Sequence, residues 1–179
     1  MTNPEKEPEV SVVIPAKDEE NTIQGVYDGV KETLEKEGKA FEIVFIDDGS
    51  RDSTFQVMKD LTQKDARVRA VRFLKNFGKS AALDAGFSRA RGAVIITMDA
   101  DLQDDPSEIP AFIRALDKGS HLVSGWKKGR QDPLSRKMAS RVFNFVTRAM
   151  SGVRIHDINC GFKAYRNEVV RSIPLYGEL

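Results

Sequence analysis

The chain has little of what marks several large protein classes. It has a single cysteine, Cys160, so no disulfide within the chain can form, and a reducing compartment is the simpler assumption. No apolar run approaches the roughly 20 residues that a membrane-spanning helix needs. The polar N-terminal stretch MTNPEKEPEV is not a signal peptide, and we expect residues 1–9 to form a flexible tail. The sequence alone therefore predicts a soluble, cytoplasmic chain.

An excess of charge of either sign is also absent. The 28 basic residues nearly balance the 27 acidic ones, which gives no reason to expect a nucleic acid as partner. A hydrophobic content of 40% and a charged content of 31% are typical of an ordinary globular protein. At this length we expect one domain with a real core, covering residues 10–179.

Apolar runs that predict strands alternate with amphipathic segments that predict helices. The expected strands are 10–16, 41–47, 68–74, 93–99 and 121–126. The expected helices begin near residues 23, 54, 79, 109 and 134, and the last of these extends to residue 150. Such alternation predicts an α/β fold with a mostly parallel sheet and helices on both faces.

The C-terminal part is less regular. Residues 158–166 alternate like an edge strand, and residues 167–173 have the pattern of a short helix. The chain then stops with no closing element, so we expect the domain to be truncated at its C-terminus.

Three acidic clusters follow predicted strands, at residues 17–20, 47–48 and 99–105. In a parallel sheet, ligands bind at the carboxyl ends of the strands, where the strand order reverses. The clusters are therefore expected to converge on one edge of the sheet.

The stretch AVIITMDADLQDDP runs an apolar strand directly into four aspartates. On an extended backbone Asp99 and Asp101 would face the same way, and Gln103 would add a carbonyl oxygen on that face. Oxygen ligands alone suit Mg²⁺ or Mn²⁺, and Mg²⁺ is usually coordinated by both protein carboxylates and substrate phosphates. Asp104 and Asp105 are expected to cap the following helix.

For other candidate residues the sequence allows either a ligand-binding role or a structural one. Asp48 and Glu19 are suited to accept hydrogen bonds from a base or ribose, or to form loop turns. The letters GKS at residues 78–80 are not a phosphate-binding P-loop, because Phe73 stands where that pattern needs glycine. Arg136 and Ser140, one helical turn apart in a basic stretch, could hold a phosphate.

Five blocks of the sequence, in this order, resemble family-two glycosyltransferases of the GT-A fold. They are SVVIPAKDEENTI, FIDDGSRDST, NFGKSAALDAGF, MDADLQDDP and INCGFKAYR. The resemblance is nearest to the polyprenyl-phosphate branch, typified by dolichyl-phosphate mannose synthases, which serves cell-envelope glycan biosynthesis. It covers nearly the whole chain from Val10 onward.

This resemblance implies a Rossmann-like GT-A fold and a metal-dependent, inverting hexosyl transfer. The donor would be a UDP- or GDP-linked sugar and the acceptor a polyprenyl phosphate, undecaprenyl or dolichyl, at the cytoplasmic face of a membrane. The donor site implied is Pro15, Lys17, Glu19, Ile46, Asp48, Asp99, Ala100 and Asp101. Asp101, Gln103 and Asp99 would hold Mg²⁺ or Mn²⁺, while Lys127, Arg136 and Ser140 would meet the acceptor phosphate. The catalytic set implied is Asp99, Asp101, Lys127 and Arg136.

Two rival functions stay open. The chain would bind donor nucleotide without turning it over if its acceptor half is incomplete. An aspartate-nucleophile phosphatase also places two aspartates after a strand, but such a site leaves the IDDGS block at residues 46–50 unexplained.

Overall fold

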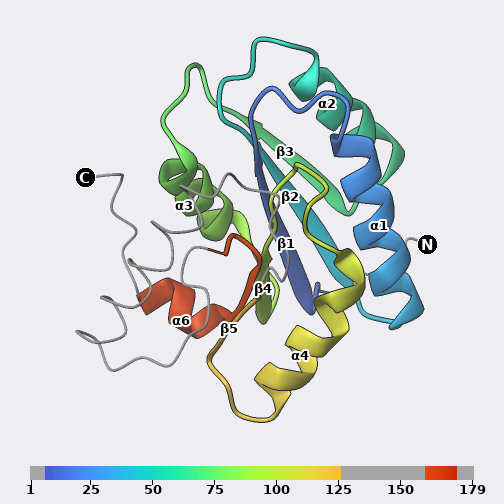
Figure 1. Ribbon diagram of the computed structural model, residues 1–179, viewed down its shortest axis with the longest axis vertical. Coiled ribbons are helices and arrows are strands. Elements are labelled where there is room, and N and C mark those ends of the chain that lie inside the picture. The colour runs from blue at the N-terminus through green and yellow to red at the C-terminus, as the bar shows by residue number, and fades with distance from the viewer. Residues whose placement is uncertain (1–6, 126–159, 173–179) are drawn as a thin grey trace, which may run out of the picture.

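The computed structural model describes residues 7–125 and 160–172, which form a six-stranded sheet covered by helices (Figure 1). The strand order is β3-β2-β1-β4-β6-β5. The strands are β1 (Val10–Ala16), β2 (Phe41–Asp47), β3 (Val68–Arg72), β4 (Val94–Thr97), β5 (Leu122–Ser124) and β6 (Lys163–Arg166).

Strands β1 to β4 are parallel to one another, and β6 runs antiparallel to both of its neighbours, β4 and β5. The first two strands are almost wholly buried, as expected for parallel strands with helices on both faces. The structure therefore confirms the α/β class and the mostly parallel sheet.

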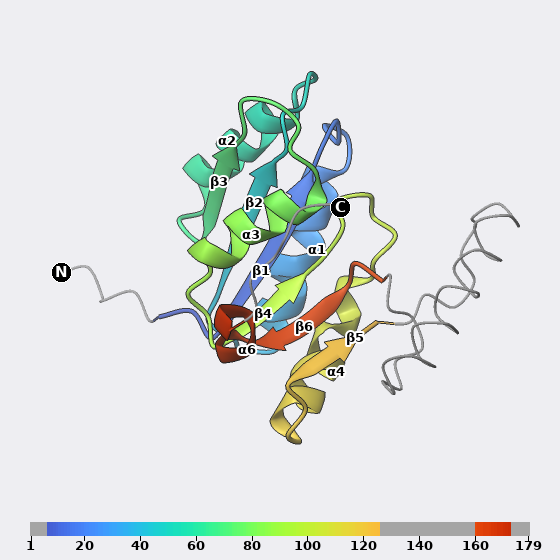
Figure 2. The ribbon, with the colours of Figure 1, turned by 90° about the vertical axis from the view of Figure 1, so that its left-hand side faces the viewer.

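The helices divide between the two faces of the sheet (Figure 2). Helices α1 (Ile23–Lys36), α2 (Thr54–Lys64) and α4 (Ile109–Asp117) pack on one face over the larger core, and a short 3₁₀ turn (Pro106–Glu108) precedes α4. Helices α3 (Lys79–Arg89) and α6 (Asn167–Ser172) lie on the opposite face over a smaller core. The apolar side of α1, which the helical spacing in the sequence predicts, is buried in the core.

Strand β6 corrects one expectation. The segment expected to be an edge strand lies inside the sheet, where β6 is paired on one side with β4 and on the other with β5. The edge position belongs to β5, which is partly exposed. Strands β3 and β4 are also shorter than expected, and the helix expected over residues 134–150 lies outside the described residues.

None of the helices in residues 7–125 and 160–172 combines the length and the apolar character that a membrane span requires.

Asp65 ties α1 to the turn between α2 and β3. Its carboxylate accepts hydrogen bonds from the backbone and guanidinium of Arg67 and, at 2.9 Å, from the hydroxyl of Tyr27 on α1. The hydrogen bonds of the Arg67 guanidinium lower the pKa of Asp65 from 3.8 to about 2. This carboxylate therefore stabilises the fold in its ionised form.

We predict that Asp65→Asn lowers the free energy of unfolding near neutral pH by on the order of 1–2 kcal/mol. Because folding lowers this pKa, the stabilisation is present above the unfolded-state pKa and is lost as the pH falls toward 2. Urea denaturation from pH 7 to pH 2 measures the difference, with the exposed Asp60→Asn on α2 as the control. A loss that stays constant down to pH 2 would contradict the assignment.

Candidate functional site

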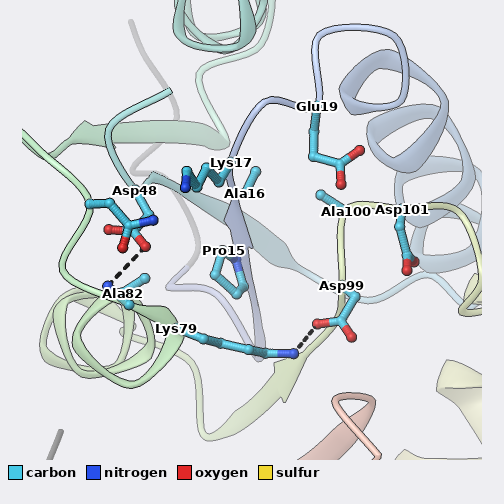
Figure 3. Close-up of a pocket in the computed structure, with 12 residues that line it drawn as sticks. Pro15, Ala16, Lys17, Glu19, Asp48, Lys79, Ala82, Asp99, Ala100 and Asp101 are labelled. Carbon is cyan, nitrogen blue, oxygen red and sulfur yellow. Dashed lines mark hydrogen bonds and ion pairs between the residues drawn. The ribbon is translucent and has the colours of Figure 1, made fainter. Parts of the chain in front are cut away.

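A cleft of about 450 Å³ opens at the carboxyl edge of the sheet, where β1 lies between β2 and β4 and the strand order reverses (Figure 3). It is formed by the ends of β1, β2 and β4 and by the beginning of α3. Its lining residues are Pro15, Ala16, Lys17, Glu19, Asp48, Asn76, Gly78, Lys79, Ala82, Asp99, Ala100 and Asp101. The acidic clusters therefore converge on one edge, as the sequence predicts.

Asp99 forms an ion pair with Lys79, and Figure 3 shows this lysine reaching from the first turn of α3 to the carboxylate that follows β4. Both side chains remain partly exposed, at 46% for Lys79 and 26% for Asp99. The pair places one positive and one negative group at the same wall of the cleft. Such a wall is suited to a ligand that carries both hydroxyl groups and negative charge.

Gly161, just before β6, supports Asp99 from the other side. A Cβ at this position would lie 2.6 Å from Asp99 Oδ2 and 2.7 Å from Oδ1, so any larger residue would require the carboxylate to shift. The carbonyl of Gly161 accepts a hydrogen bond of 2.7 Å from the hydroxyl of Thr97 at the end of β4. Asp99 is thus held between a lysine from α3 and a glycine backbone from the β6 side.

The backbone around Asp101 differs from the extended form expected from the sequence. Strand β4 ends at Thr97, and Leu102 has a φ of +60°, so the chain turns between Asp101 and Gln103. Asp101 Oδ1 accepts a hydrogen bond of 3.0 Å from the Gln103 amide, and Gln103 does not line the cleft. The expectation that residues 99, 101 and 103 share one face of an extended segment is therefore wrong.

The next two aspartates divide their roles. Asp105 accepts a hydrogen bond of 2.9 Å from the Ser107 amide and caps the 3₁₀ turn before α4, as expected. Asp104 is buried and instead accepts a hydrogen bond of 3.0 Å from the Asp99 amide. Asp104 therefore fixes the backbone of Asp99 rather than capping the helix.

Asp48 lines the cleft, but both of its oxygens already receive backbone hydrogen bonds. The amides of Phe77 and Gly78 donate to Oδ1 and Oδ2 at 2.7 and 3.0 Å. The carboxylate thereby holds the loop that leads into α3. A carboxylate oxygen accepts more than one hydrogen bond, so this anchoring does not prevent a contact with a ligand.

The loops after β1 and β2 are joined by reciprocal hydrogen bonds. Asp18 accepts from the Arg51 amide at 2.8 Å, and the Asp18 amide donates to the Ser50 hydroxyl at 2.9 Å. Glu20 accepts from the Ser53 amide at 2.9 Å. Alternate residues of the first loop therefore face the second loop, while Lys17 and Glu19 face the cleft.

Lys17 lies on the side of Asp48, and Glu19 on the side of Ala100 and Asp101 (Figure 3). Pro15 also lines the cleft, between these two sides.

Two of the described candidates, Ile46 and Gln103, do not line the cleft. Ile46 is fully buried in the smaller core, so its side chain does not line the cleft. Lys127, Arg136 and Ser140 lie outside the described residues.

Sequence reasoning missed Lys79 and Gly161. Lys79 was set aside together with the P-loop pattern, although a lysine that opens a helix after a parallel strand is placed at the binding edge. Gly161 carries no local signal in the sequence, since its role depends on a contact with Asp99.

The cleft offers oxygen ligands for a divalent cation, but the described side chains do not form a complete coordination shell. Among residues 7–125 and 160–172, no three acidic, histidine or cysteine side chains gather as a metal site. Asp101 keeps its Oδ2 oxygen without a hydrogen bond inside this part of the chain, whereas Asp99 is paired with Lys79. This donor set fits a hard ion held by Asp101 together with the oxygens of a bound phosphate.

The family model described as glycosyl transferase family 2 matches residues 11–173. The chain therefore belongs to glycosyl transferase family 2.

Two curated relatives match most of this chain. The chain is 35% identical to dodecaprenyl-phosphate galacturonate synthase of Rhizobium johnstonii over 174 residues, which are 96% of this chain and 52% of the relative. It is 38% identical to undecaprenyl-phosphate 4-deoxy-4-formamido-L-arabinose transferase of Salmonella paratyphi B over 162 residues, 90% of this chain and 50% of the relative. The chain thus spans about half the length of these curated relatives.

A solved structure confirms the GT-A architecture. Glucosyl-3-phosphoglycerate synthase from Mycobacterium tuberculosis, determined with Mn²⁺ and UDP-glucose, superposes with a TM-score of 0.72 at 22% identity. The match covers 95% of this chain and 60% of that protein. At this identity the likeness establishes the fold.

We predict that Gly161→Ala lowers the free energy of unfolding by about 1–3 kcal/mol, because the new methyl group must displace the Asp99 carboxylate. In an Asp99→Ala background the clashing atoms are gone, and the same substitution should cost at least about 1 kcal/mol less. Urea denaturation of the four proteins in this double-mutant cycle measures the coupling. Equal costs in the two backgrounds would show that Gly161 does not act through Asp99.

Proposed function

We propose that this chain is the donor-binding part of an inverting glycosyltransferase that moves a sugar from a nucleotide-diphospho-sugar to a polyprenyl phosphate. The observation that carries the proposal is the cleft at the strand-order reversal, lined by Asp99, Asp101 and Lys79 in a family-two chain. The names of the two curated relatives support the lipid-phosphate acceptor. Such an acceptor places the reaction at a membrane surface, and the family resemblance indicates the cytoplasmic face.

The cleft separates two parts of a donor molecule. Asp48 and Glu19 accept hydrogen bonds from the base and ribose, and the cleft wall between Lys79 and Asp101 receives the diphosphate. Bound Mg²⁺ or Mn²⁺ at Asp101 supplies charge neutralisation for the departing nucleoside diphosphate. Asp99, held by Lys79 and Gly161, orients the hydroxyl groups of the sugar.

The acceptor needs little activation. A phosphate monoester is already an anion, so its oxygen attacks the anomeric carbon directly while the bond to the diphosphate breaks. Attack from the face opposite the leaving group inverts the anomeric centre. The protein then contributes placement and cationic stabilisation of the leaving group, and Lys79 is a cation that lines the cleft. Lys127, Arg136 and Ser140 are proposed, by resemblance, to hold the acceptor phosphate.

Donor binding without transfer is the second candidate, and it rests on the chain spanning about half of its relatives. Both candidates require nucleotide binding, and only the first requires turnover. Release of nucleoside diphosphate from a donor sugar in the presence of a polyprenyl phosphate separates them.

We predict metal-dependent binding of either UDP or GDP, measured by calorimetric titration with Mn²⁺ and again with a chelator. Asp101→Ala should weaken this binding by at least about tenfold, because it removes the carboxylate assigned to the metal. Asp105→Ala is the matched control, since Asp105 caps the 3₁₀ turn and does not line the cleft. If neither nucleotide binds a correctly folded protein, the donor-site proposal is wrong.

We also predict that Lys79→Gln weakens binding of the same nucleoside diphosphate by about tenfold or more, because an ammonium group near the phosphates is lost. Lys79→Arg should retain most of the affinity, and Lys75→Gln should bind as the wild type does, since Lys75 does not line the cleft. Unchanged binding by Lys79→Gln would contradict a contact between this lysine and the phosphates, and its role would then be limited to the ion pair with Asp99.

A further inference from the structure

Two large apolar side chains are displayed to solvent beside the cleft. Leu74 is 103% exposed and Phe77 is 57% exposed, which makes Leu74 the most exposed large hydrophobic residue in the described structure. Both lie in the connection between β3 and α3, which projects at the carboxyl edge of the sheet (Figure 1). The same connection contributes Asn76 and Gly78 to the cleft.

The backbone of this connection is held at several points. Asp48 binds the amides of Phe77 and Gly78, and the Phe73 amide donates to the carbonyl of Asp47 at 2.8 Å. A Cβ at Gly49 would lie 2.5 Å from the carbonyl carbon of Lys75, so the two loops are in close contact. The backbone of the connection is therefore held in place, and both apolar side chains project from it, with the Phe77 ring edge-on to Phe73 at 5.5 Å between ring centres.

Positive charge accompanies these side chains. Lys75 lies in this connection, whereas the nearest other basic residues, Arg72 and Lys79, are paired with Asp47 and Asp99. Lys75 stands between Leu74 and Phe77, and its Nζ lies 5.2 Å from the centre of the Phe77 ring. Exposed apolar side chains with a lysine between them are suited to a lipid interface, where the rings and alkyl groups enter and the ammonium meets headgroups.

We propose that an apolar rim, defined as Leu74, Lys75 and Phe77, docks this domain on an anionic lipid bilayer. The inference rests on the proposed function, because a polyprenyl-phosphate acceptor requires the cleft to reach the membrane surface. Docking through the rim places the adjoining cleft at the level of the lipid headgroups. Lys75 then contacts anionic headgroups, while Leu74 and Phe77 insert among the outermost acyl groups.

The size of the rim favours a bilayer over a protein partner. A stable protein interface buries about 800 Å² on each partner, far more than two side chains and a lysine provide. Insertion into a bilayer needs no complementary surface, and each buried apolar group contributes independently.

The test is co-sedimentation with vesicles of phosphatidylcholine alone or with about 30% phosphatidylglycerol. Wild-type protein is expected to bind the anionic vesicles more tightly. The double variant Leu74→Ser, Phe77→Ser should lose about tenfold or more in partitioning into anionic vesicles. Lys75→Glu should lose about tenfold on anionic vesicles and little on neutral ones.

Matched controls lie elsewhere on the surface. Leu122→Ser removes an apolar side chain that is 39% exposed on β5, and Lys118→Glu reverses an exposed charge at the end of α4. Both should bind vesicles as the wild type does. Circular dichroism and thermal unfolding confirm that each variant is folded.

Nucleotide titration of the same proteins separates this inference from the proposed function. The rim variants should bind UDP or GDP with Mn²⁺ as the wild type does, because none of the three residues lines the cleft. If nucleotide binds, and wild type and rim variants bind vesicles equally, the proposed membrane contact of the rim is wrong while the donor site stands. Vesicle binding that depends on the rim, without nucleotide binding, overturns the donor site alone.

Two further results would overturn the bilayer as the partner. One is a folded wild-type protein that binds neither kind of vesicle. The other is self-association of the wild type that the double variant loses, without vesicle binding, which would make the rim a contact between copies of the chain.

Discussion

Hydrogen bonds that backbone amides donate to carboxylates hold the binding edge of this domain in shape. Asp48 fixes the entry to α3, Asp104 fixes the backbone of Asp99, and Asp18 joins the loops after β1 and β2. Each bond satisfies an amide that a loop leaves without a partner from a helix or strand. Much of the acidic character of this edge thus serves its architecture, and the backbone of Asp99 is positioned by Asp104, a carboxylate that does not line the cleft.

The fold was predictable where local pattern decides it. Buried runs and helical spacing located β1, β2 and α1, because a strand or helix buried against a sheet carries its pattern in its own residues. The position of β6 was not predictable in this way. Its insertion between β4 and β5 depends on pairing between distant segments, and an alternating pattern does not specify the neighbours of a strand.

The candidate site was predictable to a similar degree. Strand ends in a parallel sheet meet at one edge, so the convergence of Lys17, Asp48 and Asp99 followed from the order of elements. The orientation of each carboxylate could not be predicted, because it depends on which backbone amide lies close enough to donate a hydrogen bond to it. Leu102 illustrates the limit. Its left-handed backbone turns the chain after Asp101, and leucine has no preference for this conformation from which the turn could be predicted.

The place of β6 has a consequence for the order in which the chain folds. In the described sheet β5 pairs only with β6, so β5 has no sheet partner until residues 163–166 have been synthesised. Gly161, which supports Asp99, arrives with the same segment. During synthesis, strands β1 to β4 can therefore assemble early from nearby segments, while the wall of the cleft at Asp99 is completed only by a late, long-range pairing.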